Sequence, residues 1–374
     1  MIEKRTLIPP LLAILLLSVA LLTGCAGRPR PTTWTDLTVA GEIAYVADLE
    51  HVRALLTSSG AEQWHFPEEA GGPFYTLTLL PEQMLFVTSH ERMGGGFFSQ
   101  PQGVLRAISI NGSGVLWTFT EAKGEYIARG AVGDGIFVIG NSDGNVYALH
   151  VEDGSPAWPQ PFHTDGRVWG TPLILSDTVY VASLDHNLYA IDLETGVERW
   201  RFTAGGAMVG PPLALGDRLY IGAFDRTLYA LGREDGVTEW AVTFEDGDWI
   251  WGTPASDGTT VYVADVKGHV YAVDAESGAR RWKVSLEEPV RLGPVLDETG
   301  AHLLVGSDSG SLFNLDPTDG SVRWSRPEKG PVAALDVEGD IIYVARIYAD
   351  AHVQALRITD GEVLWTFQPP ETEE

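Results

Sequence analysis

The sequence predicts an all-β protein, a single eight-bladed β-propeller whose blades are four-stranded antiparallel sheets. A tryptophan recurs along the whole chain at intervals of 53, 41, 42, 40, 42, 42 and 41 residues. Ala stands ten residues before each Trp and Gly four residues before it, except for Asn314 and Ser113. A repeat of about 40 residues with short strands is typical of a propeller blade. We expect the eight Trp to dock between adjacent blades: Trp64, Trp117, Trp158, Trp200, Trp240, Trp282, Trp324 and Trp365.

The stretch from Ala190 to Trp200 shows how one repeat folds. Alternating apolar runs such as 179–182 precede it, and this period is that of a half-buried strand. Asp192 and Gly196 then supply a side chain that caps the backbone and a residue that tolerates positive φ, which reverses the chain tightly. We expect Trp200 to open the next strand.

The repeats follow one another without interruption, and each blade is expected to begin with its innermost strand. Gly-Thr-Pro or Gly-Pro recurs near four of these starts, where proline suits a strand end rather than a central ladder. The first and last blades are intact, so ring closure requires only that they pack together. The expected blades are 34–66, 74–119, 126–162, 168–202, 208–244, 249–284, 290–325 and 332–367.

The second blade departs from the repeat. Phe86 and Ala107 are 21 positions apart, whereas Tyr180 and Ala190 in the fourth blade are 10 apart. The added residues include a Gly-rich stretch that ends in Phe97 and Phe98. They predict a long hairpin loop, which is either functional or a tolerated insertion.

The repeat resembles the tryptophan-docking motif Ala-x-Asp-x-x-Thr-Gly-x-x-x-Trp of the pyrroloquinoline-quinone-type (PQQ-type) β-propellers, from Trp34 to Phe367. That superfamily includes quinoprotein dehydrogenases and the lipoprotein component of the outer-membrane β-barrel assembly machinery. The chain is similar to the assembly lipoprotein in length and in blade number. It also has a lipobox, the short sequence Leu22-Thr23-Gly24-Cys25 that precedes lipid attachment. The resemblance is specific for the fold, but one fold hosts many functions.

The N-terminus resembles a bacterial lipoprotein signal. Lys4 and Arg5 precede an apolar run over 7–22, which ends at Leu22-Thr23-Gly24-Cys25. The run is shorter than the roughly 20 residues that span a bilayer, although an uncleaved anchor remains the alternative. We expect a signal peptide over 1–24, lipid on Cys25, a tether over 25–33 and a disordered tail over 368–374. The protein would be exported and anchored to the outer membrane, or to the extracellular face of the plasma membrane in a host with one membrane.

The net charge of −26 narrows the possible partners. Nucleic acids and anionic lipid surfaces require a basic footprint, so neither is expected. High solubility is the simplest reading of this charge, and attraction to a basic partner is the alternative.

One face of the disc is expected to bind the partner or ligand. The loops after the second and fourth strands of every blade emerge there, and they include the second-blade insertion. The predicted face residues are Phe97, Phe98, Arg167, Trp169, Trp249, Trp251 and Arg291. Trp169 and Trp251 share one repeat position, so packing between blades is the alternative for both.

The sequence shows no catalytic or metal-ligand set. His51, His186 and His269 fall in predicted turns, and Cys25 is the only cysteine. Quinoprotein dehydrogenases that resemble this chain are longer and often place adjacent cysteines over the quinone. Ligands for PQQ or calcium cannot be matched residue by residue, so no cofactor is expected, and PQQ with calcium remains the alternative.

Three functions are consistent with these features. The first is a monomeric, non-catalytic, lipid-anchored scaffold that binds an envelope or membrane protein. The second is an envelope protein that binds a small molecule or glycan in an aromatic funnel. The third is a PQQ-dependent oxidoreductase.

Overall fold

The computed structural model describes residues 36–48, 50–69, 73–92, 101–347 and 352–369. The chain divides into two units, Met1–Thr32 and Thr33–Glu374, and every described residue belongs to the second. The expected signal peptide and tether, Cys25, Phe97, Phe98 and residues 370–374 lie outside the described residues. Across the described ranges, no helix has the length and apolar character needed to cross a membrane.

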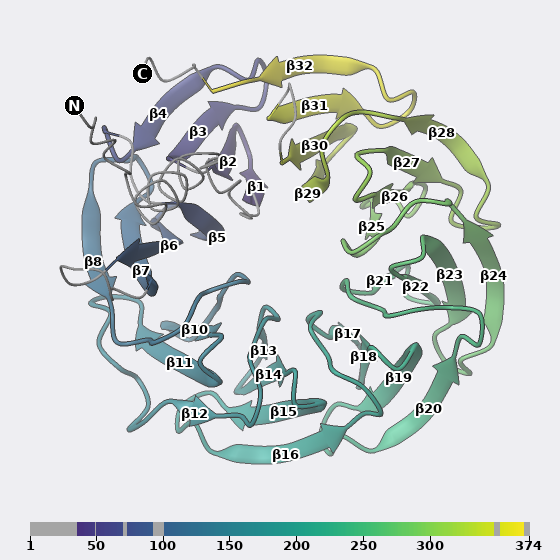
Figure 1. Cartoon of the computed structure of the whole chain (residues 1–374), viewed down its shortest axis with the longest axis horizontal. Coiled ribbons are helices and arrows are strands. Elements are labelled where there is room, and N and C mark those ends of the chain that lie inside the picture. Colours follow the sequence, from purple (N-terminus) through teal and green to yellow (C-terminus); the bar gives the residue numbers. More distant parts are fainter. Residues whose placement is uncertain (1–35, 49, 70–72, 93–100, 348–351, 370–374) are drawn as a thin grey trace, which may run out of the picture. The chain divides into compact units, whose positions relative to one another are not determined.

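Eight four-stranded sheets form the described part of the second unit, and each sheet is a meander of consecutive antiparallel strands. Figure 1 shows the sheets around a central opening, with the first strand of each innermost and the fourth outermost. This arrangement is an eight-bladed β-propeller, so the predicted fold class is confirmed. The eight sheets also follow the predicted order of blades along the chain.

Each blade is named here by its place in the chain. The strands of blades 1 to 4 are β1 (Asp36–Ala40), β2 (Ile43–Ala47), β3 (Val52–Leu56), β4 (Glu62–Phe66), β5 (Phe74–Leu80), β6 (Met84–Arg92), β7 (Pro101–Ser109), β8 (Val115–Phe119), β9 (Ala131–Gly133), β10 (Ile136–Gly140), β11 (Asn145–His150), β12 (Phe162–His163), β13 (Leu173–Leu175), β14 (Thr178–Ala182), β15 (Asn187–Asp192) and β16 (Glu198–Thr203). Those of blades 5 to 8 are β17 (Leu213–Leu215), β18 (Arg218–Gly222), β19 (Thr227–Gly232), β20 (Thr238–Thr243), β21 (Ala255–Ser256), β22 (Thr260–Ala264), β23 (His269–Asp274), β24 (Arg280–Ser285), β25 (Val295–Leu296), β26 (Leu303–Gly306), β27 (Leu312–Leu315), β28 (Val322–Arg326), β29 (Val332–Glu338), β30 (Ile341–Arg346), β31 (Val353–Arg357) and β32 (Val363–Phe367).

The inner strands of blades 4 to 7 are shorter than the sequence predicted. β13, β17, β21 and β25 each begin at the residue after a proline of the Gly-Thr-Pro or Gly-Pro motif. Proline has no N–H to donate, so the ladder starts only beyond it. The motif itself therefore lies ahead of the strand, where it borders the central opening.

The outer strands also differ from the prediction in detail. Trp200 is the third residue of β16, and the docking Trp holds the same place in six other blades, so the strand opens two residues earlier than expected. Blade 3 is the exception, because Trp158 precedes a two-residue β12. Pro156, Pro159 and Pro161 surround Trp158 and remove the N–H groups that a longer strand would need.

Blade 2 contains the longest hairpin. β6 and β7 are nine residues each and pair as far as Arg92 opposite Pro101. Part of the insertion therefore lengthens two strands instead of forming a loop. Residues 93–100 between them lie outside the described part of the chain.

The hydrophobic core is divided among the blade interfaces. Among the described residues, eight clusters of buried side chains occur, and each combines residues from two neighbouring blades. One cluster joins blade 1 to blade 8 through residues such as Leu37, Val46, Tyr343 and Trp365. A sheet that buries its faces only against neighbouring sheets needs the complete ring, which explains why the repeat is unbroken.

Each docking Trp packs on a glycine of the next blade. A Cβ added to Gly196 would lie 2.7 Å from the ring of Trp158, so only glycine lets the indole approach this closely. The eight glycines also have φ between 68° and 75°, which few other residues adopt readily. The full set is Trp64 on Gly112, Trp117 on Gly154, Trp158 on Gly196, Trp200 on Gly236, Trp240 on Gly278, Trp282 on Gly320, Trp324 on Gly361 and Trp365 on Gly60.

The two irregular positions of the repeat have structural explanations. In blade 2 the docking glycine is Gly112 rather than the residue at position 113, because the turn is one residue tighter. Asn314 occupies the Ala position of blade 7 and is fully buried. Its amide donates to the carbonyl oxygen of Ile358 at 2.8 Å, which satisfies the buried polar group.

Blade 8 closes the ring on blade 1 without sharing a strand. Trp365 packs on Gly60 and donates its indole N–H to the carbonyl of Thr57 at 2.7 Å. A carboxylate oxygen of Asp336 accepts the N–H of Val39 at 2.9 Å. The seam is therefore closed by the same Trp-to-Gly contact as the other interfaces, with an added polar contact.

Candidate binding face and central funnel

The links between blades and the turns between second and third strands pack against each other on one face, called here the link face. The N–H of Phe224 donates to the carbonyl of Ala207 at 2.9 Å, and that of Val266 donates to Trp249 at 3.0 Å. The same bond recurs in the pairs Ser142 to Glu125, Leu184 to Arg167, Asp308 to Pro289 and Ile347 to Pro331. Two loop classes thus meet on this face, as the strand order requires, and they hold one another in place.

Carboxylates in these turns are engaged in structure. Asp265 is fully buried and accepts backbone N–H groups of Asp248 and Lys267, each at 3.0 Å. It also accepts the hydroxyl of Tyr271 at 3.1 Å. An aspartate with a similar tyrosine bond recurs in blades 3 to 5 as Asp143, Asp185 and Asp225. The abundance of acidic residues here therefore reflects turn formation.

Trp249 stands out on the link face because its backbone is fixed while its ring is exposed. Its side chain is 47% exposed, whereas Ile250 beside it is fully buried against Gly222. Its N–H donates to the side chain of Asp248 at 2.9 Å, and its carbonyl accepts the N–H of Val266. An aromatic ring on a fixed backbone can bind a partner at a low cost in conformational entropy.

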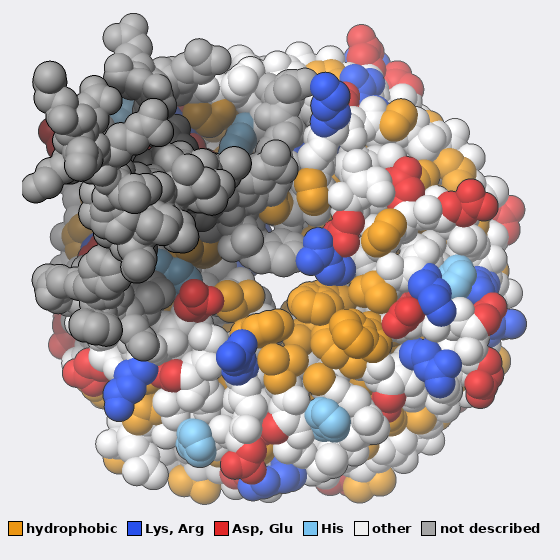
Figure 2. Space-filling model, in the orientation of Figure 1, with side chains coloured by type: hydrophobic (Ala, Val, Ile, Leu, Met, Phe, Trp, Pro, Cys, Tyr) orange, Lys and Arg blue, Asp and Glu red, His pale blue; other side chains and the backbone are white. Residues whose placement is uncertain are grey.

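An aromatic row connects Trp249 to the central opening. Phe224 stacks on Trp249 with ring centroids 4.7 Å apart and an interplanar angle of 9°, and it contacts Trp251 at 5.1 Å. Trp251 in turn lies 6.4 Å from Trp169. Figure 2 shows hydrophobic side chains gathered beside the opening, on the side of the inner strands β17 and β21. We call Trp249, Phe224, Trp251 and Trp169 the aromatic row.

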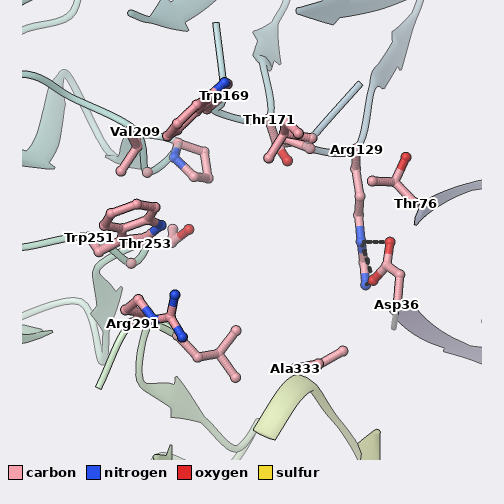
Figure 3. Close-up of a pocket in the computed structure, with 18 of the residues that line it drawn as sticks. Asp36, Thr76, Arg129, Trp169, Thr171, Val209, Trp251, Thr253, Arg291 and Ala333 are labelled. Atoms are coloured by element: carbon pink, nitrogen blue, oxygen red, sulfur yellow. Dashed lines mark hydrogen bonds and ion pairs between the residues drawn. The ribbon is translucent and has the colours of Figure 1, made fainter. Parts of the chain in front are cut away.

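The inner end of this row lines a cavity of about 440 Å³ in the middle of the ring, called here the funnel. Figure 3 shows Trp169, Val209 and Trp251 on one side of it, opposite Arg129 and Asp36. Gly252 and Gly293 let the segments ahead of β21 and β25 approach closely, since a Cβ on Gly252 would lie 2.2 Å from the nitrogen of Gly293. Both glycines line the funnel, together with Trp251 and Thr253 beside them.

An ion pair ties three blades together at the funnel. The Arg129 Nε of blade 3 lies 2.9 and 3.0 Å from the two carboxylate oxygens of Asp36 in blade 1. Asp36 also accepts the N–H of Leu77 in blade 2 at 2.8 Å. Desolvation lowers the pKa of Arg129, but the neighbouring Asp36 carboxylate outweighs it and the pKa is raised overall. The Arg129 guanidinium therefore stays charged and is held against the Asp36 carboxyl group.

A second ion pair lies across the funnel. Arg291 Nε contacts a carboxylate oxygen of Asp308 at 2.6 Å. Tyr75 also lines the wall, and burial together with the charge of Glu125 raises its pKa to about 12. Tyr75 is therefore an uncharged phenol at neutral pH, and the charged groups of the described lining are Asp36 with Arg129 and Asp308 with Arg291.

The structure places three of the predicted face residues in the funnel and two others outside it. Trp169, Trp251 and Arg291 line the funnel, Trp249 lies on the rim of the link face, and Arg167 covers Trp169 at 5.9 Å from its ring centroid. Sequence reasoning missed three residues: Phe224, Arg129 and Asp36. Phe224 could have been noticed as an aromatic in a turn where blades 4 and 6 have Leu184 and Val266.

The described histidines and carboxylates do not form a metal site. Over the described ranges, no three His, Cys, Asp or Glu side chains lie close enough together to hold a metal ion. His186 lies in a turn with φ of 73°, but His269 begins β23, so its assignment to a turn was wrong. The described funnel lining thus offers no carboxylate set for Ca²⁺, and its two arginines already face carboxylates. The lining residues therefore do not fit PQQ with a bound Ca²⁺, because the ion needs several oxygen ligands and PQQ itself carries carboxylates that need free cationic partners.

Comparison with known proteins agrees with the repeat and the fold. The family model described as "Outer membrane protein assembly factor BamB" matches residues 101–196, 169–265, 240–299 and 266–373. The chain belongs to this family. The resemblance to PQQ-type propellers is therefore confirmed, and within them the layout is that of BamB.

Curated relatives match over part of their length. The BamB protein of Shewanella oneidensis is 28% identical over 160 residues, which are 39% of this chain and 37% of that protein. The BamB protein of Moranella endobia is 26% identical over 197 residues, 49% of this chain and 47% of that protein. The match therefore spans between a third and a half of these relatives. An enzyme, the β-alanine-activating enzyme of Danio rerio, is 31% identical over 80 residues but only 7% of its own length.

Solved structures are similar in fold. BamB from Moraxella catarrhalis superposes with a TM-score of 0.71 at 17% identity, covering 83% of this chain and 92% of that one. The computationally designed protein Ika8 gives 0.72 at 13% identity, covering 88% and 98%. Because a designed protein matches equally well, this likeness carries information on the fold and none on function.

Proposed function

We propose that this protein is a non-catalytic, lipid-anchored scaffold of the bacterial envelope that takes part in outer-membrane protein assembly. Its family membership supports a role in outer-membrane protein assembly, because both BamB relatives are described as outer-membrane protein assembly factors. The proposed role is to hold another envelope protein on the link face. The propeller would act as a monomer.

The observation that carries this proposal is the exposed end of the aromatic row. Trp249 is 47% exposed and lies flat on Phe224, so a broad apolar surface meets solvent. Rigid aromatic side chains are typical anchors of protein interfaces. Arg226 and Lys267 lie in the turns between second and third strands of blades 5 and 6, so charged groups surround Trp249. Arg226 donates to the carbonyl of Glu245 at 3.1 Å, and the Lys267 Nζ lies 3.7 Å from a carboxylate oxygen of Asp248. An apolar side chain of the partner would pack on Trp249.

The test is co-purification from detergent-solubilised membranes of the native host. The full chain with its own signal is compared with a variant carrying Trp249→Ala and Phe224→Ala. We expect the variant to lose its envelope partner by at least tenfold, since central interface aromatics contribute about 2 kcal/mol or more each. Thermal unfolding of the variant should change little.

A matched control removes exposed apolar groups from the opposite face. Val197 and Val237 follow the docking turns and are 62% and 60% exposed. Val197→Ser with Val237→Ser should retain the partner. Partner loss in this control, together with retention in the Trp249 and Phe224 variant, would assign binding to the other face.

We also propose that Cys25 carries the lipid that anchors the scaffold. Its support is the lipobox Leu22-Thr23-Gly24-Cys25 after a short apolar run. Two or three acyl chains anchor a protein stably, whereas one binds reversibly. Cys25→Ser should shift the protein out of the membrane fraction or leave it unprocessed. Intact-mass measurement that found an unmodified Cys25 in membrane-bound wild type would refute the anchor.

A further inference from the structure

The described lining of the funnel balances two carboxylates with two guanidinium groups and is rich in aromatic and hydroxyl groups, and this combination restricts what it can bind. Its volume of about 440 Å³ lies within the range of small-molecule sites, roughly 300–1,000 Å³. The charged groups of its described lining are Asp36 with Arg129 and Asp308 with Arg291. Each carboxylate faces a guanidinium, so an anionic ligand would compete with groups already in place. The charge distribution favours an uncharged ligand.

The aromatic wall offers flat surfaces to such a ligand. Trp169 and Trp251 belong to blades 4 and 6, and their rings are inclined by 32° with centroids 6.4 Å apart. Both are only partly buried, on the same side of the funnel (Figure 3). The face of an indole is negative and attracts the weakly positive C–H groups of a sugar ring.

Two hydroxyl groups stand beside this wall. Thr171 and Thr253 line the funnel, and Figure 3 shows their hydroxyl oxygens turned toward its interior. Neither side chain has a hydrogen bond to another described residue, whereas Thr76 on the opposite wall is bonded to Thr88 at 2.8 Å. Thr171 and Thr253 are therefore available to donate and accept with a ligand.

We propose that the funnel binds a neutral saccharide, with one sugar ring stacked on Trp251 and its hydroxyls bonded to Thr253, Thr171 and the Arg291–Asp308 pair. The Asp308 carboxylate, which Arg291 holds in place, has acceptor sites left for a sugar hydroxyl. This site is separate from the surface of Trp249 and Phe224 that we propose binds a protein. Trp251 lines the funnel and also contacts Phe224. Glycan binding and scaffold binding can therefore fail independently.

The test uses the purified chain without its signal region and two probes, maltotriose and the trisaccharide of N-acetylglucosamine. Saturation-transfer NMR and calorimetry should detect binding of at least one at millimolar or tighter Kd. Thr253→Val keeps the side-chain shape and should weaken binding about fivefold or more, the loss expected for one hydrogen bond of about 1 kcal/mol. Trp251→Leu should weaken it at least tenfold.

A control variant distinguishes the funnel from the surface around Trp249. Trp249→Ala should leave saccharide affinity unchanged, and every variant is checked for an unaltered far-ultraviolet spectrum. Absence of binding by both probes would overturn the proposal. It would be overturned equally by binding that survives both Thr253→Val and Trp251→Leu, or by PQQ with Ca²⁺ displacing a bound saccharide at lower concentration.

Discussion

The docking tryptophans and the tryptophans of the aromatic row belong to one protein but follow different rules. All eight docking rings lie on a glycine of the next blade, and six donate their indole N–H to a backbone carbonyl there. Trp169, Trp249 and Trp251 do not lie on docking glycines, and their ring contacts are with one another and with Phe224. The indole nitrogen of Trp169 is buried without a partner among the described residues. The docking contact is repeated in all eight blades, whereas Trp169 and Trp251 share a repeat position in blades 4 and 6 and Trp249 occurs in blade 6.

This difference follows from what each environment must satisfy. A docking Trp fills an interface that recurs eight times, so its partners are set by the repeat. The aromatic row occurs only over blades 4 to 6, and no rule of the fold requires exposed Trp249. Departure from the repeat is therefore the feature that marks a candidate binding surface.

The strongest test of the contrast compares Trp158→Ala with Trp249→Ala. Trp158 is 3% exposed, and its truncation should cost about 3–5 kcal/mol of unfolding free energy. Trp249→Ala should cost less than about 0.5 kcal/mol, as expected for a surface position. Urea unfolding followed by circular dichroism measures both. Similar losses for the two variants would remove the distinction between docking and binding tryptophans.

A second test addresses the glycine side of the docking contact. Gly196→Ala introduces a Cβ that meets Trp158 at 2.7 Å, and it also places Ala at φ of 72°. Gly216→Ala has a similar φ of 61° but meets nothing within 4 Å. The Gly216 variant should lose only the unfolding free energy that a positive φ costs alanine, about 1–2 kcal/mol. Gly196→Ala should lose clearly more by the same unfolding assay, and equal losses would show that the Trp contact is not tight.

The fold was predictable from sequence because its determinants repeat. Trp200, Ala190 and Gly196 recur at fixed offsets, and a spacing that returns eight times is unambiguous. Departures from the expected strand bounds came from local chemistry, such as the prolines around Trp158 that shorten β12. Ser113 was misplaced in the glycine position because the tighter turn at Gly112 cannot be seen from spacing alone.

The candidate site was only partly predictable. Trp169 and Trp251 could be assigned to the funnel from their position ahead of inner strands. Asp36 and Arg129 could not, because they come from blades 1 and 3 and lie 93 positions apart in the sequence. A pair formed between two different blades leaves no local pattern in the sequence. The stacking of Phe224 on Trp249 was hidden for the same reason.

A third test isolates the indole N–H. Trp158 donates to the carbonyl of Leu193 at 2.8 Å, whereas Trp200 makes no hydrogen bond to any described residue and is only partly buried. Phe keeps most of the ring but lacks the donor. Trp158→Phe should therefore cost about 1 kcal/mol more than Trp200→Phe, measured by thermal unfolding. A larger loss at Trp200 would mean that ring size, rather than the hydrogen bond, sets the ranking.

The smallest expected effect concerns acid stability at the docking turn. Arg199 and then Thr195 lower the pKa of Asp192 to about 2, from an ordinary value near 3.8. A carboxyl with a lowered pKa contributes stability above its unfolded pKa and loses that contribution as the pH falls through the folded pKa. The contribution of Asp192 should therefore be complete above pH 4 or so and disappear toward pH 2.

Asp192→Asn keeps an oxygen for the bonds from Thr195 but removes the ion pair with Arg199. The pair is partly exposed, so the variant should be less stable than wild type by under about 1 kcal/mol at pH 7. The two unfolding curves should converge as the pH is lowered from 4 to 2, because wild type alone loses the ion pair. Other acidic groups, such as Asp257, titrate in both proteins and cancel in the difference. A difference that stayed constant over this range would show that Asp192 acts through the turn geometry and not through its charge.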